Sequence, residues 1–265
     1  RPLEGTAFPI PGAPKQTMTG LMARDVTHEI DLQRRRNTFV SISSHELRTP
    51  MTTVVGFSEL LLKRDLPDTT TREWIERIHQ SGQILSAIVD DMLNVSRIQS
   101  GKLAVSLEHL QLDDLVDETL AGIKSASDGH EFRVDIPPET PSVVADREKL
   151  SQVLINLLTN AAKYSPGGGL ITVSARHEAE RDRVLAKVAD QGIGIAAEDQ
   201  KQLFSTFYRI RRPETEKIKG TGLGLNIVKG LVEMMNGEVW VESELNKGTS
   251  FFFTIPTTRT DMVEG

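Results

Sequence analysis

The stretch FVSISSHELRTPMTTVVGFSELL, residues 39–61, decides the fold of the N-terminal part of this chain. Apolar residues recur in it every seven positions, with Met51 interleaved, at Val40, Leu47, Val54 and Leu61. A seven-residue apolar repeat forms one stripe along a helix, and that stripe packs against another helix. We therefore expect a long helix from about Thr27 to Arg64.

A second helix is expected after the segment DLPDTT (65–70), whose proline and aspartates end the first helix. Thr70 followed by Glu73 resembles a capping box, and Ser100-Gly101 predicts the helix end. The apolar stripe of this helix consists of Trp74, Ile78, Leu85, Ile88, Met92 and Val95. Two long helices with a short loop form an all-α antiparallel helical hairpin. Because one hairpin cannot bury both stripes, we expect a homodimer in which a second copy completes a four-helix bundle.

The pattern changes after residue 101 and predicts a separate α/β domain. Segments rich in β-branched and aromatic residues predict strands at 102–107, 131–136, 171–178, 183–190, 237–243 and 249–255. Helices are expected at 111–125, 146–163, 197–204 and 223–235. Strand pairs mixed with helices predict an α/β sandwich, with a helical layer on one face of a largely antiparallel sheet.

The chain is expected to divide into four parts. Residues 1–20 are rich in Pro, Gly and Thr and receive no predicted element, and a short strand at 21–26 completes the first part, 1–26. The hairpin occupies 27–101 and the α/β domain 102–258. Residues 259–265 are expected to form a disordered tail.

Composition excludes several kinds of protein. Hydrophobic residues make up 38% and charged residues 26% of the 265, which favours packed domains over disorder. A net charge of −6 offers no basic surface to nucleic acid, and the absence of cysteine excludes disulfides and thiolate zinc sites. No segment approaches the roughly 18 consecutive apolar residues of a membrane span. Because the chain begins with Arg1, we expect a fragment of a longer protein, which could itself be soluble or membrane-anchored. We expect this fragment to be cytoplasmic and to make no membrane contact.

His45 is predicted to point away from the apolar stripe of its helix. At 100° per residue it lies about 140° around the helix from Val40. Pro50 removes a backbone donor, so we expect the helix to bend just after this point. A neutral imidazole is a nucleophile near pH 7, and the adjacent Glu46 can fix its tautomer and accept its other proton. Thr49 lies one turn further on the same side. For a histidine taken alone, the alternative is an ordinary solvated side chain, which is how we interpret the other five.

The segment LINLLTNAAKYS (154–165) carries a polar face on an otherwise apolar helix. Asn156 and Asn160 are four residues apart and project from one face, with Lys163 on a neighbouring face. Amide oxygens can coordinate Mg²⁺, and an ammonium group can contact phosphate. Two polar residues on a solvated helix edge are an equally good interpretation of this segment alone.

Two glycine-rich segments follow, DQGIGI (190–195) and GTGLGLNIV (220–228). Asp190 can accept a hydrogen bond from an adenine amino group, and Gly192 and Gly194 let the backbone approach the base. The glycines of 220–228 precede a helix, so backbone N–H groups can surround phosphates there. The G-x-G-x-G spacing is not the Rossmann fingerprint, and no Gly-Lys-Ser/Thr of a P-loop follows. A D-x-G-x-G turn alone also occurs in many hairpins.

The segment HELRTP (45–50), followed by an apolar helix, resembles the H-box of sensor histidine kinases of two-component systems. The resemblance implies that His45 is phosphorylated on a ring nitrogen and that Glu46 is the assisting base. It also implies that Thr49 positions water when the same domain dephosphorylates its partner, the receiver domain of a response regulator.

The segments 154–165, 190–195 and 220–228, with FSTFYR (204–209) between the last two, resemble the N, G1, G2 and F boxes of the GHKL ATP-binding fold. The resemblance implies ATP and Mg²⁺ as cofactors, and a mobile ATP lid at 205–221. Carried over residue by residue, it implies Mg²⁺ binding by Asn156 and Asn160, phosphate contacts by Lys163 and Arg209, nucleotide contact by Tyr164, adenine binding by Asp190, Gly192 and Gly194, and a phosphate end lined by Gly220, Thr221, Gly222, Leu223 and Gly224.

Upstream, RDVTHEIDLQRRR (24–36) resembles the exit of a PAS-type sensor domain, which makes 1–26 the end of a sensor region. An ordinary charged helix start is the alternative.

Three functions compete for this combination of motifs. GHKL ATPases of the chaperone, gyrase and mismatch-repair kind resemble one another in placing a glutamate where this chain has Asn156, so hydrolysis should be slow here. A degenerate module that only binds nucleotide or a partner predicts erosion of one box, and none is eroded. We therefore predict an ATP-dependent protein-histidine kinase that phosphorylates His45 and passes the phosphoryl group to an aspartate of a response regulator, with phosphatase activity as well.

Overall fold

The computed structural model of the protein describes residues 3–10, 18–63, 67–123, 129–210, 212, 215, 218 and 220–258. The chain forms two compact units, Arg1–Gly82 and Gln83–Gly265, and each is described by itself. No helix in the described ranges is both long and apolar enough to span a membrane.

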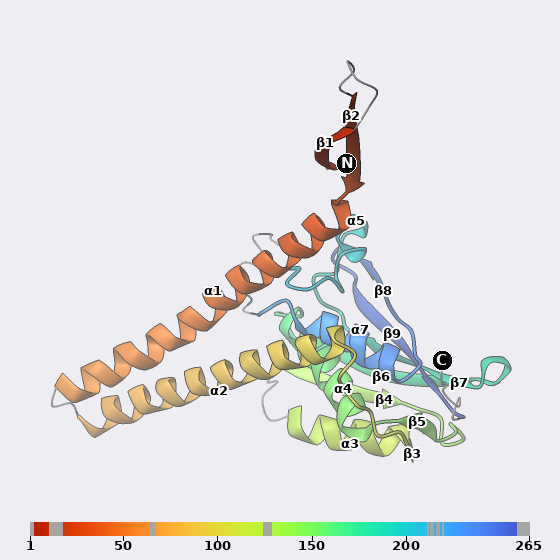
Figure 1. The fold of residues 1–265 in the computed structure, drawn as a ribbon. Coiled ribbons are helices and arrows are strands. Elements are labelled where there is room, and N and C mark those ends of the chain that lie inside the picture. The colour runs from red at the N-terminus through yellow and green to blue at the C-terminus, as the bar shows by residue number, and fades with distance from the viewer. Residues whose placement is uncertain are drawn as a thin grey trace. The chain divides into compact units, whose positions relative to one another are not determined.

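The first unit begins with a β-hairpin, of which the sequence predicted only the short strand at 21–26. Strand β1 (Leu3–Ile10) pairs antiparallel with β2 (Met18–Asp25), and the register runs from Leu3 opposite Asp25 to Ile10 opposite Met18 (Figure 1). Prolines and glycines within these segments lower their strand propensity. Cross-strand pairing, which a single segment cannot reveal, therefore determines the structure here.

Helix α1 (Thr27–Lys63) confirms the first predicted helix almost to its ends. Asp25 Oδ1 accepts a hydrogen bond from the Thr27 backbone N–H at 2.9 Å at the start of the helix, and the helix continues through Pro50. The apolar stripe is only partly covered within one chain, since Val40 is 57% exposed and Met51 52% exposed.

Helix α2 (Asp68–Gln99) follows, and the Phe57 and Trp74 rings pack at 5.5 Å across the turn of the helical hairpin. The predicted capping box is wrong, because the helix begins two residues before Thr70. The N–H of Thr71 already bonds to the Pro67 carbonyl at 3.0 Å.

The end of α2 confirms the predicted stop at Gly101. This residue has φ +63°, and its N–H donates to the Ile98 carbonyl at 3.1 Å. The next N–H, of Lys102, donates to the Arg97 carbonyl at 3.0 Å. These two bonds form a Schellman motif, for which glycine is favoured because the backbone is left-handed.

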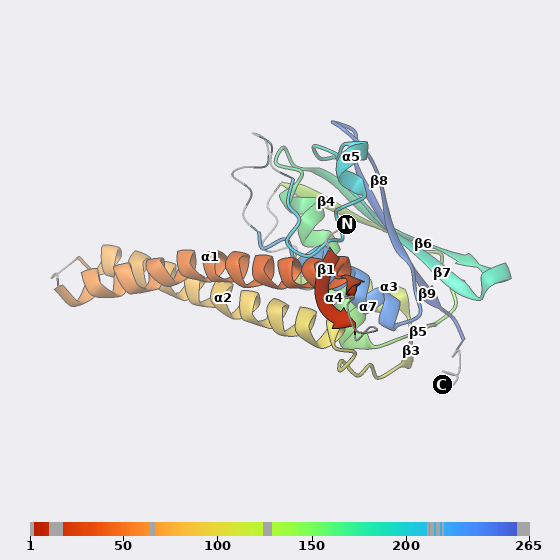
Figure 2. The same cartoon turned by 45° about the horizontal axis from the view of Figure 1, so that its top comes forward.

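The second unit contains a five-stranded sheet in the order β4-β6-β7-β9-β8, which can be followed in Figure 2. Its strands are β4 (His130–Asp135), β6 (Gly169–Glu178), β7 (Arg183–Ala189), β8 (Val239–Glu244) and β9 (Gly248–Pro256). The β4–β6 pair is parallel and the other three pairs are antiparallel. The largely antiparallel sheet is therefore confirmed.

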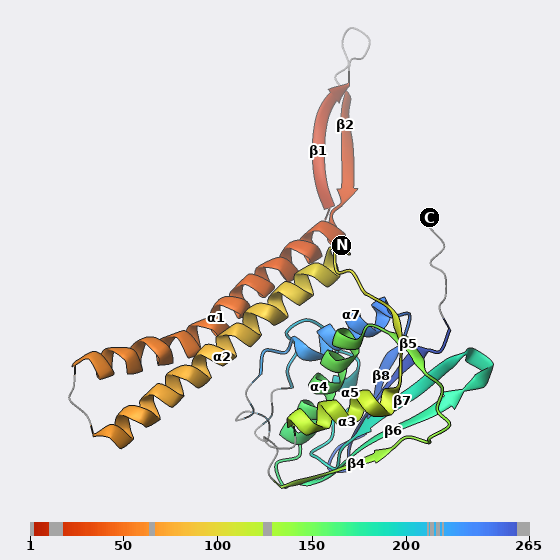
Figure 3. The same ribbon diagram turned by 90° about the horizontal axis from the view of Figure 1, so that it is seen from below.

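Three helices cover one face of this sheet, as Figure 3 shows. They are α3 (Leu112–Ile123), α4 (Arg147–Lys163) and α7 (Gly224–Met234). On β9, the alternating residues Phe251, Phe253 and Ile255 are buried, which is the pattern of a strand whose one face lies on the core. This arrangement confirms the predicted α/β sandwich.

The strand predicted at 102–107 is wrong. That segment belongs to no strand, and the backbone N–H of Ser106 donates to Asp146 Oδ2 at 2.8 Å instead of joining a ladder. The neighbouring strand β3 (Glu108–Leu110) pairs with β5 (Val143–Ala145) in a small sheet. Three-residue strands are too short to show an alternating pattern.

The smaller elements complete the second unit. Helix α5 (Ala197–Gln200) is a single turn rather than the predicted 197–204, and η2 (Ala179–Arg181) connects β6 to β7. The predicted helix 111–125 is observed as Leu112–Ile123, and positions 124 and 125 lie outside the described residues. The predicted tail, 259–265, lies outside the described residues.

Candidate functional site

His45 lies on α1 with its side chain 74% exposed, so the predicted outward orientation is confirmed. Its Nδ1 is 3.4 Å from Glu46 Oε1, which makes the carboxylate the neighbour of this ring nitrogen. Thr49 is exposed one turn further along the helix. The imidazole is thus accessible from solvent while one of its nitrogens faces an acceptor.

The second unit contains a cavity of about 650 Å³, which is within the size range of small-molecule and cofactor sites. It brings together eleven of the predicted nucleotide-binding residues, namely Asn156, Asn160, Lys163, Tyr164, Asp190, Gly194, Arg209, Gly220, Thr221, Gly222 and Gly224. Segments up to 68 positions apart (156 to 224) therefore meet on one wall.

Helix α4 positions the amides. Asp146 caps the helix by accepting a hydrogen bond from the Lys149 N–H at 3.1 Å, and Leu157 and Leu158 are fully buried. The Asn156 Nδ2 donates to the Gln152 carbonyl at 3.0 Å. Because Nδ2 makes this bond, the oxygen Oδ1 is the amide atom that lies toward α7. A Cβ added at Gly224, the first residue of α7, would be 2.7 Å from Asn156 Oδ1.

The oxygen ligands that the cavity offers fit an Mg²⁺ ion bound together with a polyphosphate. Mg²⁺ keeps several waters and takes few protein ligands besides substrate phosphates, and amide oxygens are suitable ligands. Asn156 and Asn160 supply two such oxygens on the cavity wall. In the described ranges no three His, Cys, Asp or Glu side chains cluster as a metal site.

The cations of the site lie beside Tyr164. The Lys163 Nζ is 5.8 Å from the centre of the Tyr164 ring. Burial and the nearby Arg209 guanidinium lower the pKa of Lys163, and burial raises the pKa of Tyr164. A Cβ on Gly220 would be 2.7 Å from Nζ, so glycine leaves room for this ammonium group. Two adjacent positive charges in a partly buried wall favour an anionic ligand such as a triphosphate.

Asp190 is buried at the end of β7. Its Oδ1 accepts hydrogen bonds from the Gly192 N–H at 2.8 Å and from the Thr249 N–H at 3.2 Å. Burial raises the pKa of Asp190, and the two backbone bonds oppose that rise. These two bonds hold the carboxylate in a fixed position on the cavity wall. Thr249 was missed by the sequence interpretation, because it lies 59 positions from its partner.

Two predicted residues are not on the cavity wall. Gly192 packs against the end of α4, where a Cβ would be 2.1 Å from the Tyr164 carbonyl oxygen. Leu223 is fully buried directly before α7, and its N–H donates to Thr221 Oγ1 at 3.2 Å. Both residues shape the loops rather than line the space.

The ends of the predicted lid are joined. The Phe207 N–H donates to the Gly222 carbonyl at 2.9 Å, and Gly222 has φ +71°. A Cβ on Gly222 would be 2.8 Å from the Phe207 carbonyl carbon, so only glycine fits. Within the predicted lid, 205–221, positions 211, 213, 214, 216, 217 and 219 lie outside the described residues.

Another residue missed by the sequence interpretation is Asp91 on α2, which also lines the cavity. Burial and the adjacent Asp90 raise its pKa to about 6, and a hydrogen bond from Thr221 opposes the rise. No local motif marks this aspartate. The other wall residues without a predicted role are Thr159, Ile193, Ile195, Leu203, Tyr208, Ile210, Arg212, Thr215, Leu225, Leu245, Asn246, Thr249 and Phe251.

The geometry defines a nucleotide-binding α/β domain that follows a helical hairpin with an exposed histidine. Both the helical hairpin and the α/β domain match known protein families. Residues 35–101 match the His Kinase A (phospho-acceptor) domain, and residues 145–259 match the histidine kinase-, DNA gyrase B- and HSP90-like ATPase. The chain belongs to the sensor histidine kinases of two-component systems, and its α/β domain is an ATP-binding domain.

Individual relatives are similar over most of this chain. The sensor histidine kinase WalK of Bacillus subtilis is 34% identical over 88% of this chain and 38% of its own length. The circadian input-output histidine kinase CikA of Synechococcus elongatus is 37% identical over 82% of this chain and 29% of its own. The chain covers 28% of the length of the non-motile and phage-resistance protein of Caulobacter vibrioides and 48% of the length of a sensor-like histidine kinase of Rhizobium meliloti, so it spans less than half of these relatives.

Solved structures agree with the fold. The Acinetobacter baumannii histidine kinase AdeS has a TM-score of 0.66 at 25% identity, over 81% of this chain and 98% of that one. Histidine kinase ThkA in complex with response regulator TrrA has a TM-score of 0.61 at 25% identity, over 97% of this chain and 75% of that one. Full-length ShkA in complex with AMPPNP has a TM-score of 0.62 at 27% identity, over 84% of this chain and 47% of that one.

Proposed function

We propose that this chain phosphorylates His45 from Mg²⁺–ATP and passes the phosphoryl group to an aspartate of a response regulator. The observation that carries the proposal is the exposed imidazole beside Glu46, in a chain whose second unit holds a nucleotide-sized cavity. A nucleophile on the protein surface is what a phosphoryl transfer without a positioned water requires.

The ring geometry supports Nε2 as the reacting nitrogen. Because Nδ1 of His45 faces the Glu46 carboxylate, the lone pair of Nε2 is the one that faces outward to attack the γ-phosphorus. The N–P bond forms while the bond from phosphorus to the leaving oxygen of ADP breaks. Glu46 accepts the Nδ1 proton, which keeps the phosphorylated ring neutral.

The second half-reaction passes the phosphoryl group from His45 to the regulator. A carboxylate oxygen of the regulator's aspartate attacks phosphorus, the N–P bond breaks, and His45 regains its proton through Glu46. We further propose that Thr49, exposed one turn beyond, positions water when the regulator is dephosphorylated.

The nucleotide is held by residues of the second unit. Asp190 accepts from the adenine amino group, Lys163 and Arg209 contact phosphates, and Asn156 and Asn160 hold Mg²⁺. When held there, Mg²⁺ would supply positive charge to offset the negative charge of the phosphates. Asn156 cannot remove a proton from water, so the site favours transfer to a side chain over hydrolysis.

The exposed stripe of α1 supports a homodimer as the working unit. Val40 and Met51, each more than half exposed, belong to the seven-residue repeat. A second copy covers such a stripe in a four-helix bundle.

Labelling with γ-³²P-ATP tests the proposal. We expect label that is lost in acid and kept in base, the behaviour of a phosphohistidine. The His45→Gln variant should lose the label and still bind nucleotide. The matched control is His79→Gln, which removes another exposed histidine from the helical hairpin and should label normally. Full labelling of His45→Gln would exclude His45 as the acceptor.

A further inference from the structure

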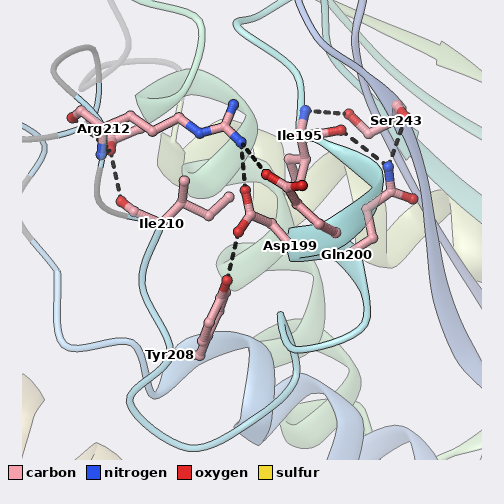
Figure 4. Close-up of polar contacts among 9 residues, drawn as sticks. Ile195, Asp199, Gln200, Tyr208, Ile210, Arg212 and Ser243 are labelled. Atoms are coloured by element: carbon pink, nitrogen blue, oxygen red, sulfur yellow. Dashed lines mark hydrogen bonds and ion pairs between the residues drawn. The ribbon is translucent and has the colours of Figure 1, made fainter.

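A carboxylate outside the predicted motifs joins the lid segment to the rest of the second unit. Asp199 lies on α5 with its side chain 18% exposed. Its Oδ1 accepts a hydrogen bond from the Tyr208 hydroxyl at 2.7 Å, and its Oδ2 accepts one from Arg212 Nη2 at 2.7 Å (Figure 4). Each carboxylate oxygen therefore holds a different residue of the lid segment.

The short helix that carries Asp199 is itself fixed to the sheet. The Gln200 Nε2 donates to the carbonyls of Ile195, at 3.0 Å, and Ser243, at 2.8 Å. The Ile195 N–H donates to Ser243 Oγ at 2.8 Å (Figure 4). Since Ser243 is part of β8, these bonds attach α5 to an edge strand of the sheet, and Asp199 is a fixed point rather than a mobile surface charge.

The neighbouring Glu198 provides a contrast on the same helix. It is 3.9 Å from Arg212 and its side chain is 83% exposed. Exposed pairs at this distance contribute little. The Asp199 contacts are short and partly buried, which is the condition under which charge-assisted hydrogen bonds are strong.

The two residues that Asp199 holds both line the nucleotide cavity. Beyond them, the buried Thr215 donates to the Ile210 carbonyl at 2.7 Å and accepts from the Arg212 N–H at 3.0 Å. Asp199 itself is not on the cavity wall. It acts on the site through Tyr208 and Arg212.

We propose that Asp199 is a positioning residue for ATP, which holds Tyr208 and Arg212 on the cavity wall before nucleotide binds. The proposal rests on the proposed function, since it concerns the same nucleotide site. With these contacts in place, part of the lid segment is already ordered, and binding costs less conformational entropy. Loss of the contacts weakens ATP binding and leaves the rate at saturating ATP nearly unchanged.

The initial rate of autophosphorylation of Asp199→Asn, measured at increasing ATP concentration, tests this directly. The amide oxygen can still accept a hydrogen bond from Tyr208 or Arg212, but its NH₂ group cannot accept one from the other residue, so we expect KM for ATP to rise about tenfold. The kcat value should stay within about twofold. The matched control Glu198→Gln, one residue earlier, should leave both values unchanged.

Tyrosine titration gives a second readout, which reports the hydrogen bond between Tyr208 and Asp199 directly in protein that circular dichroism shows to be folded. The chain has two tyrosines, and the hydrogen bond to Asp199 raises the pKa of Tyr208. In a Tyr164→Phe background, tyrosinate absorbance reports Tyr208 alone. Asp199→Asn should move that pKa down toward the ordinary value of tyrosine.

The outcomes separate the two proposals. If the unaltered protein binds no Mg²⁺–ATP or labels no histidine, the proposed function fails. If it does both and Asp199→Asn keeps the same KM, the positioning role is overturned. Should Asp199→Asn not fold, Tyr208→Phe removes one of the two bonds and should raise KM about threefold. An unchanged KM in that variant would overturn the role as well.

Discussion

Replacement of Asp190 by asparagine tests base selection with little change in shape. An amide oxygen can keep both backbone bonds, from Gly192 at 2.8 Å and Thr249 at 3.2 Å. The second oxygen becomes an NH₂ donor, which repels the donor amino group of adenine. A hydrogen bond to a charged partner contributes about 1.5–3 kcal/mol, so ADP should bind roughly 10- to 150-fold more weakly.

Calorimetric titration with ADP and with IDP measures this effect. Hypoxanthine presents an acceptor where adenine presents its amino group, so Asp190→Asn should bind IDP better relative to ADP than the unaltered protein does. An unchanged ratio of the two affinities would refute the role of Asp190 in base selection, whatever the absolute loss.

The same variant should not be less stable at neutral pH. Burial raises the pKa of Asp190, so the folded protein binds this proton more tightly than the unfolded chain does. The contribution of this group to stability is therefore present at low pH and is lost as the pH rises through the raised pKa. Asp190→Asn avoids that loss, so its melting temperature relative to the unaltered protein should increase from acid to neutral pH. A relative fall would show that the carboxylate stabilises the fold.

Two further predictions concern the phosphate end of the cavity. Asp91→Asn should bind ADP about fivefold more tightly at pH 7.5, because the change removes roughly 1 kcal/mol of charge repulsion. Since the pKa of Asp91 is about 6, the difference between the variant and the unaltered protein should vanish near pH 5. Equal affinities of the two proteins at both pH values would show that this carboxylate is not near the phosphates. Gly222→Ala should weaken ADP binding at least tenfold, since a left-handed backbone costs about 1–2 kcal/mol without glycine and its Cβ would be 2.8 Å from Phe207. The control Gly122→Ala, with no atom within 4 Å of its Cβ, should bind normally, and normal binding by Gly222→Ala would contradict the need for glycine in the loop.

Much of the fold followed from local patterns in the sequence. The seven-residue repeat predicted α1 to within a residue of its end, and segments rich in β-branched and aromatic residues predicted all five strands of the main sheet. Two strands were missed or misplaced because their backbone bonds go to partners outside the local segment. Ser106 bonds to Asp146, forty positions away, and β1 depends on its pairing with β2.

In the candidate site, too, local spacing predicted some residues and could not predict others. Asn156 and Asn160 could be placed together because helix spacing fixes their relation. Asp91 and Asp199 could not be found, since neither lies in a motif and both act through residues far along the chain or in another element. The role of Gly192 also differs from its prediction, because only the structure shows the Tyr164 carbonyl that excludes a side chain there.

Localisation of the phosphoryl group on the chain tests the central claim most directly. After incubation with Mg²⁺–ATP, peptides are kept at neutral or alkaline pH and sequenced by electron-transfer mass spectrometry. The phosphate should lie on His45, and nuclear magnetic resonance of the phosphorylated protein should place it on Nε2. Phosphate on another residue, or on none while the protein binds ATP, would contradict the account.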